Sequence, residues 1–418
     1  MSIDRFVQKP YVSAGKLMVE NNLLKKDSDN SLSIFYNNCW ISVPPANQFD
    51  LTAATIFGLN ERLTLTALSP LADDSGLTLR EKFNEEWMNY GQALEDDNLL
   101  SYGWFAYYPE RNHLVHFCDP YWHKVVAVAS SSTLLSDANF KLKWKEVRDI
   151  FSKTVIGVAG CSVGSNIIHN IMMDMRPDNI KIADKVPYKM ENINRVRLGY
   201  WDMVKSNAAR AGIMDVGLKN KAHVVADQIY SIDPFVNVYV YDEGLNMDNI
   251  DQFFGGNASE PKLDIIVEEI DDPQSKLFIR QEAKKRRVPL IMASDMGSMV
   301  QVEVSRYDLD TDCPLTYGVS DSDFINSVEE ISKSGTDRKL FFSFVDTLIG
   351  KDYRQDELLR IMEEKCEIPT STIVPQLGST AAASGAIVAE LVARIRLGYQ
   401  YPPRFFFNKK TLEVKIFQ

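Results

Sequence analysis

The chain has 418 residues, of which 45% are hydrophobic and 25% are charged, values that are ordinary for a folded globular protein. Its formal net charge of -11 argues against a nucleic acid or an anionic membrane as partner. No apolar run reaches the roughly 18 residues of a membrane span, and the polar start Met1–Arg5 lacks a signal-peptide pattern. Five cysteines without a C-x-x-C pair favour a reducing, cytoplasmic location over a disulfide framework or a four-cysteine zinc site.

The pattern of the chain predicts two domains that meet near residue 140. Residues 1–140 form an N-terminal accessory domain of α+β type whose role the sequence does not show. Within it, residues 77–94 predict a helix, and residues 102–122 predict aromatic-rich strands. The second domain, residues 141–418, carries all the features that point to a function.

From residue 141 onward, predicted strands and helices alternate, which is the βαβ rhythm of a doubly wound, Rossmann-like and mostly parallel α/β sheet. Residues 299–308 alternate apolar and polar side chains, so we expect an antiparallel extension at the sheet edge. Residues 308–375 are polar and less regular, and a long apolar helix then ends at Gly398. The predicted strands are residues 154–159, 179–184, 236–242, 263–270 and 288–294, and the predicted helices are residues 143–153, 165–175, 219–233, 273–287 and 378–398.

The segment G-C-S-V-G, from Gly160 to Gly164, permits two interpretations. It fits the nucleophile elbow of serine hydrolases, and it also fits a glycine-rich turn that holds a nucleotide phosphate between a strand and a helix. A hydrolase of this type needs a histidine base later in the chain. Only His169 and His223 follow Ser162, and both precede several strands of the sheet. We therefore favour the phosphate turn, in which the two glycines let a phosphate approach the backbone.

Polar residues after the next strand extend this nucleotide pattern. Asp184 ends that strand, where a carboxylate can accept hydrogen bonds from ribose hydroxyls. Asn192, Asn194 and Arg195 follow shortly afterwards and are expected to contact the nucleotide. The turn and Asp184 alone would also fit an NAD(P)-dependent oxidoreductase.

Two further segments supply charges that suit a triphosphate better than a hydride donor. Lys219 and Lys221 precede a helix, and Asp271 and Asp272 follow a buried strand, at the edge where open α/β sheets bind ligands. The lysines can neutralise phosphates, and Asp271 can hold Mg²⁺, whereas Asp272 is expected to cap the helix that begins at Pro273. Such a set suits the attack of a carboxylate on an α-phosphate.

Three segments, residues 182–195, 217–234 and 263–291, resemble the bacterial ThiF/MoeB/HesA branch of the ubiquitin-activating-enzyme superfamily. The resemblance extends over residues 141–418. Residues 243–254 and 374–391 further resemble a subgroup whose members are often fused to nitroreductase-like domains. The family adenylates the C-terminal carboxylate of a small protein or peptide with ATP and Mg²⁺, so the same activity is implied for this chain.

The resemblance also implies a role for each matching residue. Asp184 corresponds to the ribose-binding acid, and Asn192 to an asparagine that helps to hold the nucleotide phosphates. Arg195 and Lys221 correspond to the pair that neutralises the phosphates, and Asp271 to the aspartate associated with Mg²⁺. Gly160 and Gly164 correspond to parts of the phosphate turn.

Some alternatives stay open at this stage. The glycine turn has fewer glycines than usual, so a non-catalytic nucleotide-binding scaffold is the second hypothesis and an NAD(P)-dependent oxidoreductase is the third. Lys219 competes with Lys221 for the phosphate role, and either Cys313 or Cys366 could act as a catalytic thiol. The acceptor could be a ubiquitin-like protein, a sulfur-carrier protein or a ribosomal peptide. A homodimer is expected, because relatives pair their nucleotide domains.

Overall fold

The computed structural model describes residues 9–28, 31–44, 47–50, 104–117, 144–203, 218–334, 338–350 and 376–417. The chain divides into two compact units, and each is described by itself. The first unit comprises residues 1–148 and 230–235, and the second comprises residues 149–229 and 236–418. The helix predicted at residues 77–94 lies outside the described residues, and so does Cys366.

The first unit contains two small sheets and a short helix, α1 (Gly15–Glu20). One sheet has the order β1-β6-β7-β5 and the other the order β2-β3-β4. The predicted aromatic strands of this region are present, as an antiparallel hairpin of β6 and β7. The strands are β1 (Tyr11–Ala14), β2 (Leu24–Lys26), β3 (Leu32–Tyr36), β4 (Cys39–Val43), β5 (Gln48–Asp50), β6 (Trp104–Tyr108) and β7 (His113–Phe117).

The second unit is built on an eight-stranded sheet with the order β10-β9-β8-β11-β12-β13-β14-β15. The pairs from β10 to β12 are parallel, and the pairs from β12 to β15 are antiparallel. This confirms the predicted doubly wound α/β fold with an antiparallel extension. The strands are β8 (Val155–Ala159), β9 (Asn179–Ala183), β10 (Asn237–Tyr241), β11 (Ile265–Glu268), β12 (Leu290–Met296), β13 (Met299–Ser305), β14 (Arg404–Asn408) and β15 (Glu413–Phe417).

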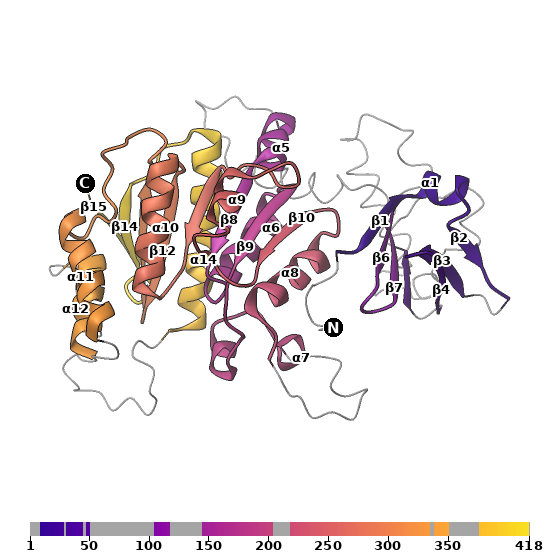
Figure 1. Ribbon diagram of the computed structural model, residues 1–418, viewed down its shortest axis with the longest axis horizontal. Coiled ribbons are helices and arrows are strands. Elements are labelled where there is room, and N and C mark those ends of the chain that lie inside the picture. Colours follow the sequence, from indigo (N-terminus) through magenta and orange to yellow (C-terminus); the bar gives the residue numbers. More distant parts are fainter. Residues whose placement is uncertain are drawn as a thin grey trace. The chain divides into compact units, whose positions relative to one another are not determined.

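Helices cover both faces of this sheet (Figure 1). Helix α14 packs on α6 and against β12 and β13, whereas α9 and α10 bury phenylalanine and isoleucine side chains on the opposite face. The helices of the unit are α5 (Trp144–Lys153), whose first residues belong to the first unit, α6 (Gly164–Asp174), η3 (Met190–Asn194), α7 (Tyr200–Met203), α8 (Lys221–Ile232), whose last residues belong to the first unit, α9 (Ile250–Gly255), α10 (Pro273–Arg286), α11 (Asp321–Ser334), α12 (Arg338–Ile349) and α14 (Gly378–Leu397). None of the described helices is long and apolar enough to span a membrane.

The strand order fixes where a ligand can enter. The chain runs from β8 outward to β9 and β10, then returns to place β11 on the other side of β8. The sheet therefore changes its winding direction between β8 and β11. In open α/β sheets, the crevice at such a point lies beyond the carboxyl ends of the strands.

One sequence expectation needs correction. Residues 308–375 were expected to be irregular, but this stretch contains the helices α11 and α12. Both bury apolar side chains in a shared cluster that includes Phe324, Val328, Phe344 and Leu348. The apolar positions of α11 are separated by many polar residues, whereas α12 is a short apolar segment of 12 residues, so neither gives the long apolar pattern of the 20-residue α14.

Candidate functional site

The turn between β8 and α6 lies at the point where the sheet reverses. Gly160 has a φ of +99°, and a side chain at this position would collide with the backbone carbonyl of Glu269. Only glycine adopts this backbone without strain. Gly164 is the first residue of α6, so the helix begins directly after the turn, and the N–H groups of Ser165 and Asn166 donate back to the Ser162 and Val163 carbonyls at 3.2 and 2.9 Å.

The geometry of the turn is not that of a hydrolase. The Oγ atom of Ser162 is buried and has no hydrogen-bond partner among the described residues, so no histidine there contacts it. The ring of His223 instead lies 3.1 Å from the Oδ2 atom of Asp242. Cys161 is fully buried, and burial, reinforced by Asp184, raises the pKa of its thiol well above the usual value. This cysteine is therefore a packing residue, because a nucleophile would have to be a thiolate.

Asp184 closes the turn from the side of β9. Its Oδ2 atom accepts a hydrogen bond from the backbone N–H of Cys161 at 2.8 Å, and its Oδ1 atom accepts one from Val186 at 3.0 Å. The Nζ atom of Lys221 lies 4.0 Å from Oδ2. Each carboxylate oxygen can accept a second hydrogen bond, so the residue keeps capacity for a ligand hydroxyl. The structure thus brings Asp184, Lys221 and the turn together.

Asn192 and Asn194 lie in η3, which follows β9, and Arg195 comes directly after this short helix. The side-chain oxygen of Asn192 accepts a hydrogen bond from the Lys189 N–H at 2.8 Å, so this buried asparagine holds the N-terminus of the short helix. The side-chain oxygen of Asn194 accepts a hydrogen bond from the Nη1 atom of Arg195 at 3.4 Å. Asn166, on α6, donates to the backbone carbonyl of Arg195 at 2.8 Å. These contacts tie Arg195 to the helix that follows the turn.

A cavity of about 250 Å³ lies beyond the carboxyl ends of β8, β11 and β12. Among the predicted residues, Arg195 and Asp271 line it, whereas Asp184 and Lys221 lie on the far side of the turn. Ser162 lines the cavity, and the backbone N–H of its neighbour Cys161 donates to Asp184. The turn therefore connects the cavity residues with Asp184 and Lys221. The lining residues are Ser162, Val163, Arg195, Glu269, Ile270, Asp271, Lys276, Ala293, Ser294, Asp295, Met296, Gln301, Phe344, Val345, Leu348, Ile349 and Gln376.

Two carboxyl groups in this cavity were missed by the sequence reasoning. Burial, together with Asp295 and Glu268, raises the pKa of Glu269 well above the ordinary value. Burial, reinforced by Asp271, raises the pKa of Asp295 to about 7, although Ser384 and Arg195 oppose the shift. Asp295 follows the predicted strand 288–294, so the rule that identified Asp271 after β11 could have identified it too.

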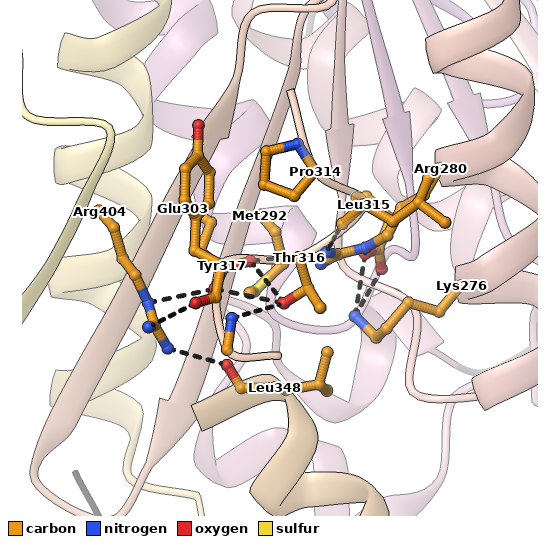
Figure 2. Close-up of polar contacts among 12 residues, drawn as sticks. Lys276, Arg280, Met292, Glu303, Pro314, Leu315, Thr316, Tyr317, Leu348 and Arg404 are labelled. Carbon is orange, nitrogen blue, oxygen red and sulfur yellow. Dashed lines mark hydrogen bonds and ion pairs between the residues drawn. The ribbon is translucent and has the colours of Figure 1, made fainter. Parts of the chain in front are cut away.

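A buried ionic network supports the floor of the cavity. Glu268, at the end of β11, accepts hydrogen bonds from the Lys276 ammonium at 2.7 and 3.0 Å and from Arg280 at 3.1 Å. Glu303 of β13 lies between Arg280 and Arg404, at 3.5 and 3.2 Å (Figure 2). All five side chains are at most 6% exposed, and opposite charges face one another throughout.

The cavity has acidic groups but no complete protein cage for a metal. Within the described ranges, no group of three or more histidine, cysteine or acidic residues has the geometry to hold an ion. Mg²⁺ usually takes one or two carboxylates from a protein and its other ligands from water and substrate phosphates. The carboxylate of Asp271 fits that smaller contribution. Asp272 serves instead as the predicted helix cap, since it accepts a hydrogen bond from the Ser275 N–H at 2.9 Å and Pro273 begins α10.

The ThiF family model matches residues 146–417 of the chain. The curated "Uncharacterized protein MT1398" of Mycobacterium tuberculosis (strain CDC 1551 / Oshkosh) is 26% identical over 335 residues, which cover 79% of this chain and 42% of that protein. The chain therefore spans less than half of the length of this relative.

Several solved structures are similar to the chain at low identity. Selenomethionine PaaA has a TM-score of 0.46 at 15% identity, over 71% of this chain and 82% of that one. E. coli MccB with ATP has a TM-score of 0.42 at 15% identity, over 69% of this chain and 70% of that one. The microcin C7 biosynthetic enzyme MccB in complex with N-formylated MccA has a TM-score of 0.43 at 13% identity, over 72% of each chain.

Proposed function

The chain belongs to the ThiF family, and from this premise we propose that residues 141–418 form an ATP-dependent adenylation domain. Its substrate would be the C-terminal carboxylate of a small protein or peptide. The observation that carries the proposal is the arrangement around the glycine turn. Asp184 and Lys221 lie on one side of the turn, and Arg195 and Asp271 lie in the cavity on its other side.

The polar groups of this region fit a nucleotide. The Oγ atom of Ser162 and the Nε atom of Arg195 are buried without partners among the described residues, and both residues line the cavity. A buried polar group without a partner costs free energy, so a ligand that supplies partners is favoured. Phosphate oxygens would accept hydrogen bonds from both atoms. The ribose hydroxyls would donate to Asp184.

In the proposed reaction, a carboxylate oxygen of the acceptor attacks the α-phosphorus of ATP. The bond from that phosphorus to the bridging oxygen breaks, and pyrophosphate leaves with the bonding electrons. A carboxylate is already ionised at neutral pH, so no general base is needed. Arg195 and Lys221 would stabilise the negative charge that accumulates on the phosphates.

Asp271 would hold Mg²⁺ beside the phosphates. Bound there, the ion would neutralise phosphate charge and orient the triphosphate. The residue lines the cavity next to Arg195, so an acidic and a basic side chain face the same space. The acid would hold the metal while the arginine contacts a phosphate oxygen directly.

Calorimetry with ATP and Mg²⁺ tests the nucleotide site and separates the two candidate lysines. Lys221→Ala should weaken ATP binding about 10-fold or more, because a charge-assisted contact to phosphate is lost. Lys219→Ala is the matched control and should bind ATP within about 2-fold of the unaltered protein. The reverse order would transfer the phosphate role to Lys219. No binding to either ATP or NADH would favour the scaffold hypothesis, and binding of NADH alone would favour the oxidoreductase.

We also propose that the chain acts as a homodimer. The outer face of α14 and the strands β14 and β15 form an apolar groove of about 660 Å³. Near it, Val414 and Ile416 are 57% and 60% exposed. Half of the α14 residues are buried, so its outer face is the part of the helix available to a second copy. Light scattering should give twice the 47.4 kDa chain mass, and Ile416→Asp should shift the mass toward that of one chain.

A further inference from the structure

The cavity holds buried hydrogen-bond acceptors that the described residues leave incompletely satisfied. Asp295 is 5% exposed; the Ser384 hydroxyl and the charge of Arg195 act on its carboxylate, but neither oxygen has a hydrogen bond of normal geometry among the described residues. Gln301 is fully buried, and its side-chain oxygen also has none there. Its amide orientation is fixed, because the NH₂ group donates to the Leu348 carbonyl at 2.7 Å and to Glu303 at 3.2 Å. Asp295 and Gln301 both line the cavity.

The charged side chains around these acceptors also favour a positively charged ligand. Glu269 and Asp271 also line the cavity; because Asp271 is the proposed Mg²⁺ ligand, Glu269 and Asp295 are the carboxyl groups that face another ligand. Of its two basic side chains, Lys276 is already held by Glu268 through both carboxylate oxygens. Among the described lining residues, Arg195 is therefore the one basic group that is suited to a phosphate or a substrate carboxylate. The carboxyl groups and the Gln301 oxygen of the cavity are best satisfied by a ligand that supplies hydrogen-bond donors and positive charge.

The walls of the cavity add a second requirement. Helix α12 contributes four apolar side chains, and Met296 of β12 adds a fifth. A ligand group that fits has an apolar stem and a donor at its end. A terminal glycine has neither, so it would supply Asp295 with no donor beyond the Ser384 hydroxyl and water. The apolar wall residues of α12 are Phe344, Val345, Leu348 and Ile349.

We propose that this cavity binds the side chain of the acceptor's C-terminal residue, and that this side chain ends in a positively charged nitrogen, as in lysine or arginine. The inference rests on the proposed adenylation function. Asp295 is then a specificity-determining residue that receives the charged nitrogen, with Gln301 as a further acceptor in the same cavity. The main chain of that terminal residue would present its carboxylate to the side of the cavity that holds Arg195.

The test compares short peptides that differ only in the last side chain. Peptides ending in lysine, arginine, norleucine or Gly-Gly are assayed by ATP–pyrophosphate exchange. Norleucine keeps the apolar stem of lysine and lacks the nitrogen. A charge-assisted hydrogen bond inside a cavity predicts that the lysine peptide exceeds the norleucine peptide by about 10- to 100-fold in kcat/KM. Asp295→Asn should bring this ratio close to one, and Asp174→Asn, a carboxyl on α6 outside the cavity lining, should leave it unchanged.

Binding provides a readout that does not depend on turnover. Calorimetry with a non-hydrolysable ATP analogue should show tighter binding of the lysine peptide than of the norleucine peptide, again lost in Asp295→Asn. Equal binding of the two peptides, or no binding of either, overturns the inference. Exchange that is fastest with the Gly-Gly peptide also overturns it and leaves the adenylation function standing. Absence of exchange with every peptide, combined with selective binding of the lysine peptide, counts against adenylation instead.

Discussion

The substitution Asp295→Asn should stabilise the protein at neutral and alkaline pH. The pKa of this carboxyl is raised from an ordinary value of 3.8 to about 7, chiefly by burial. The folded state therefore binds the proton more tightly than the unfolded state, and stability falls as pH rises between these two values. A difference of about 3 pKa units corresponds to about 4 kcal/mol that the ionised carboxylate costs above pH 7. Asparagine removes this cost because its side chain carries no charge.

Urea unfolding followed by circular dichroism measures the effect. The free energy of unfolding of the variant minus that of the unaltered protein should increase by about 2–3 kcal/mol between about pH 5 and pH 8. The change with pH is the informative quantity, since differences in shape and hydrogen bonding between the two side chains persist at every pH. A difference that stays constant within about 0.5 kcal/mol over this range would refute the claim that burial outweighs the favourable contacts of Asp295 and raises its pKa.

Three further predictions concern the network and the turn. Glu268→Gln should destabilise the protein by about 3–5 kcal/mol, because it leaves buried cations without their partner. Glu329→Gln, which removes the exposed pair of Glu329 with Lys333 on α11, should change stability by less than about 0.5 kcal/mol in the same urea experiment. Burial opposes ionisation of Glu268, but the charges of Lys276 and Arg280 outweigh burial and lower its pKa. The contribution of Glu268 to stability should therefore be full above about pH 5 and lost as the pH falls further. Acid unfolding of the unaltered protein, compared with that of Glu268→Gln, measures this loss. Gly160→Ala should abolish ATP binding or folding, because Gly160 has a positive φ and a side chain there would collide with the Glu269 carbonyl. Gly255→Ala should affect neither, since the space around Gly255 is open. Calorimetry measures ATP binding, and circular dichroism measures folding.

The fold of the second unit could be read from the sequence because its signals are strong and local. The strand segments are short apolar runs, and their alternation with helices fixes a parallel sheet. Helix α14 was predictable to its last turn, since Gly398 adopts a φ of +78° directly after Leu397. Helices α11 and α12 were not found, because their burial depends on packing against each other.

The candidate site could be predicted only where a motif marks it. Asp184, Arg195 and Asp271 stand at strand ends or inside recognisable segments, and the structure places them around the turn. Asp295 and Gln301 carry no motif in the sequence. The position of Asp295 after the predicted strand 288–294 could have marked it, but Gln301 and the burial of both side chains become apparent only in the structure, where α12 lines the same cavity.

The most direct test of the central claim is ATP–pyrophosphate exchange with a mixture of random octapeptides that carry free C-terminal carboxylates, measured beside the same mixture with amidated C-termini. Adenylation predicts exchange with the free carboxylates, none with the amides, and a loss of about 100-fold or more in Asp271→Asn, since the metal-binding carboxylate is removed. Equal exchange with both mixtures, or none with either while calorimetry shows that ATP binds, would contradict the proposal that this chain activates a C-terminal carboxylate.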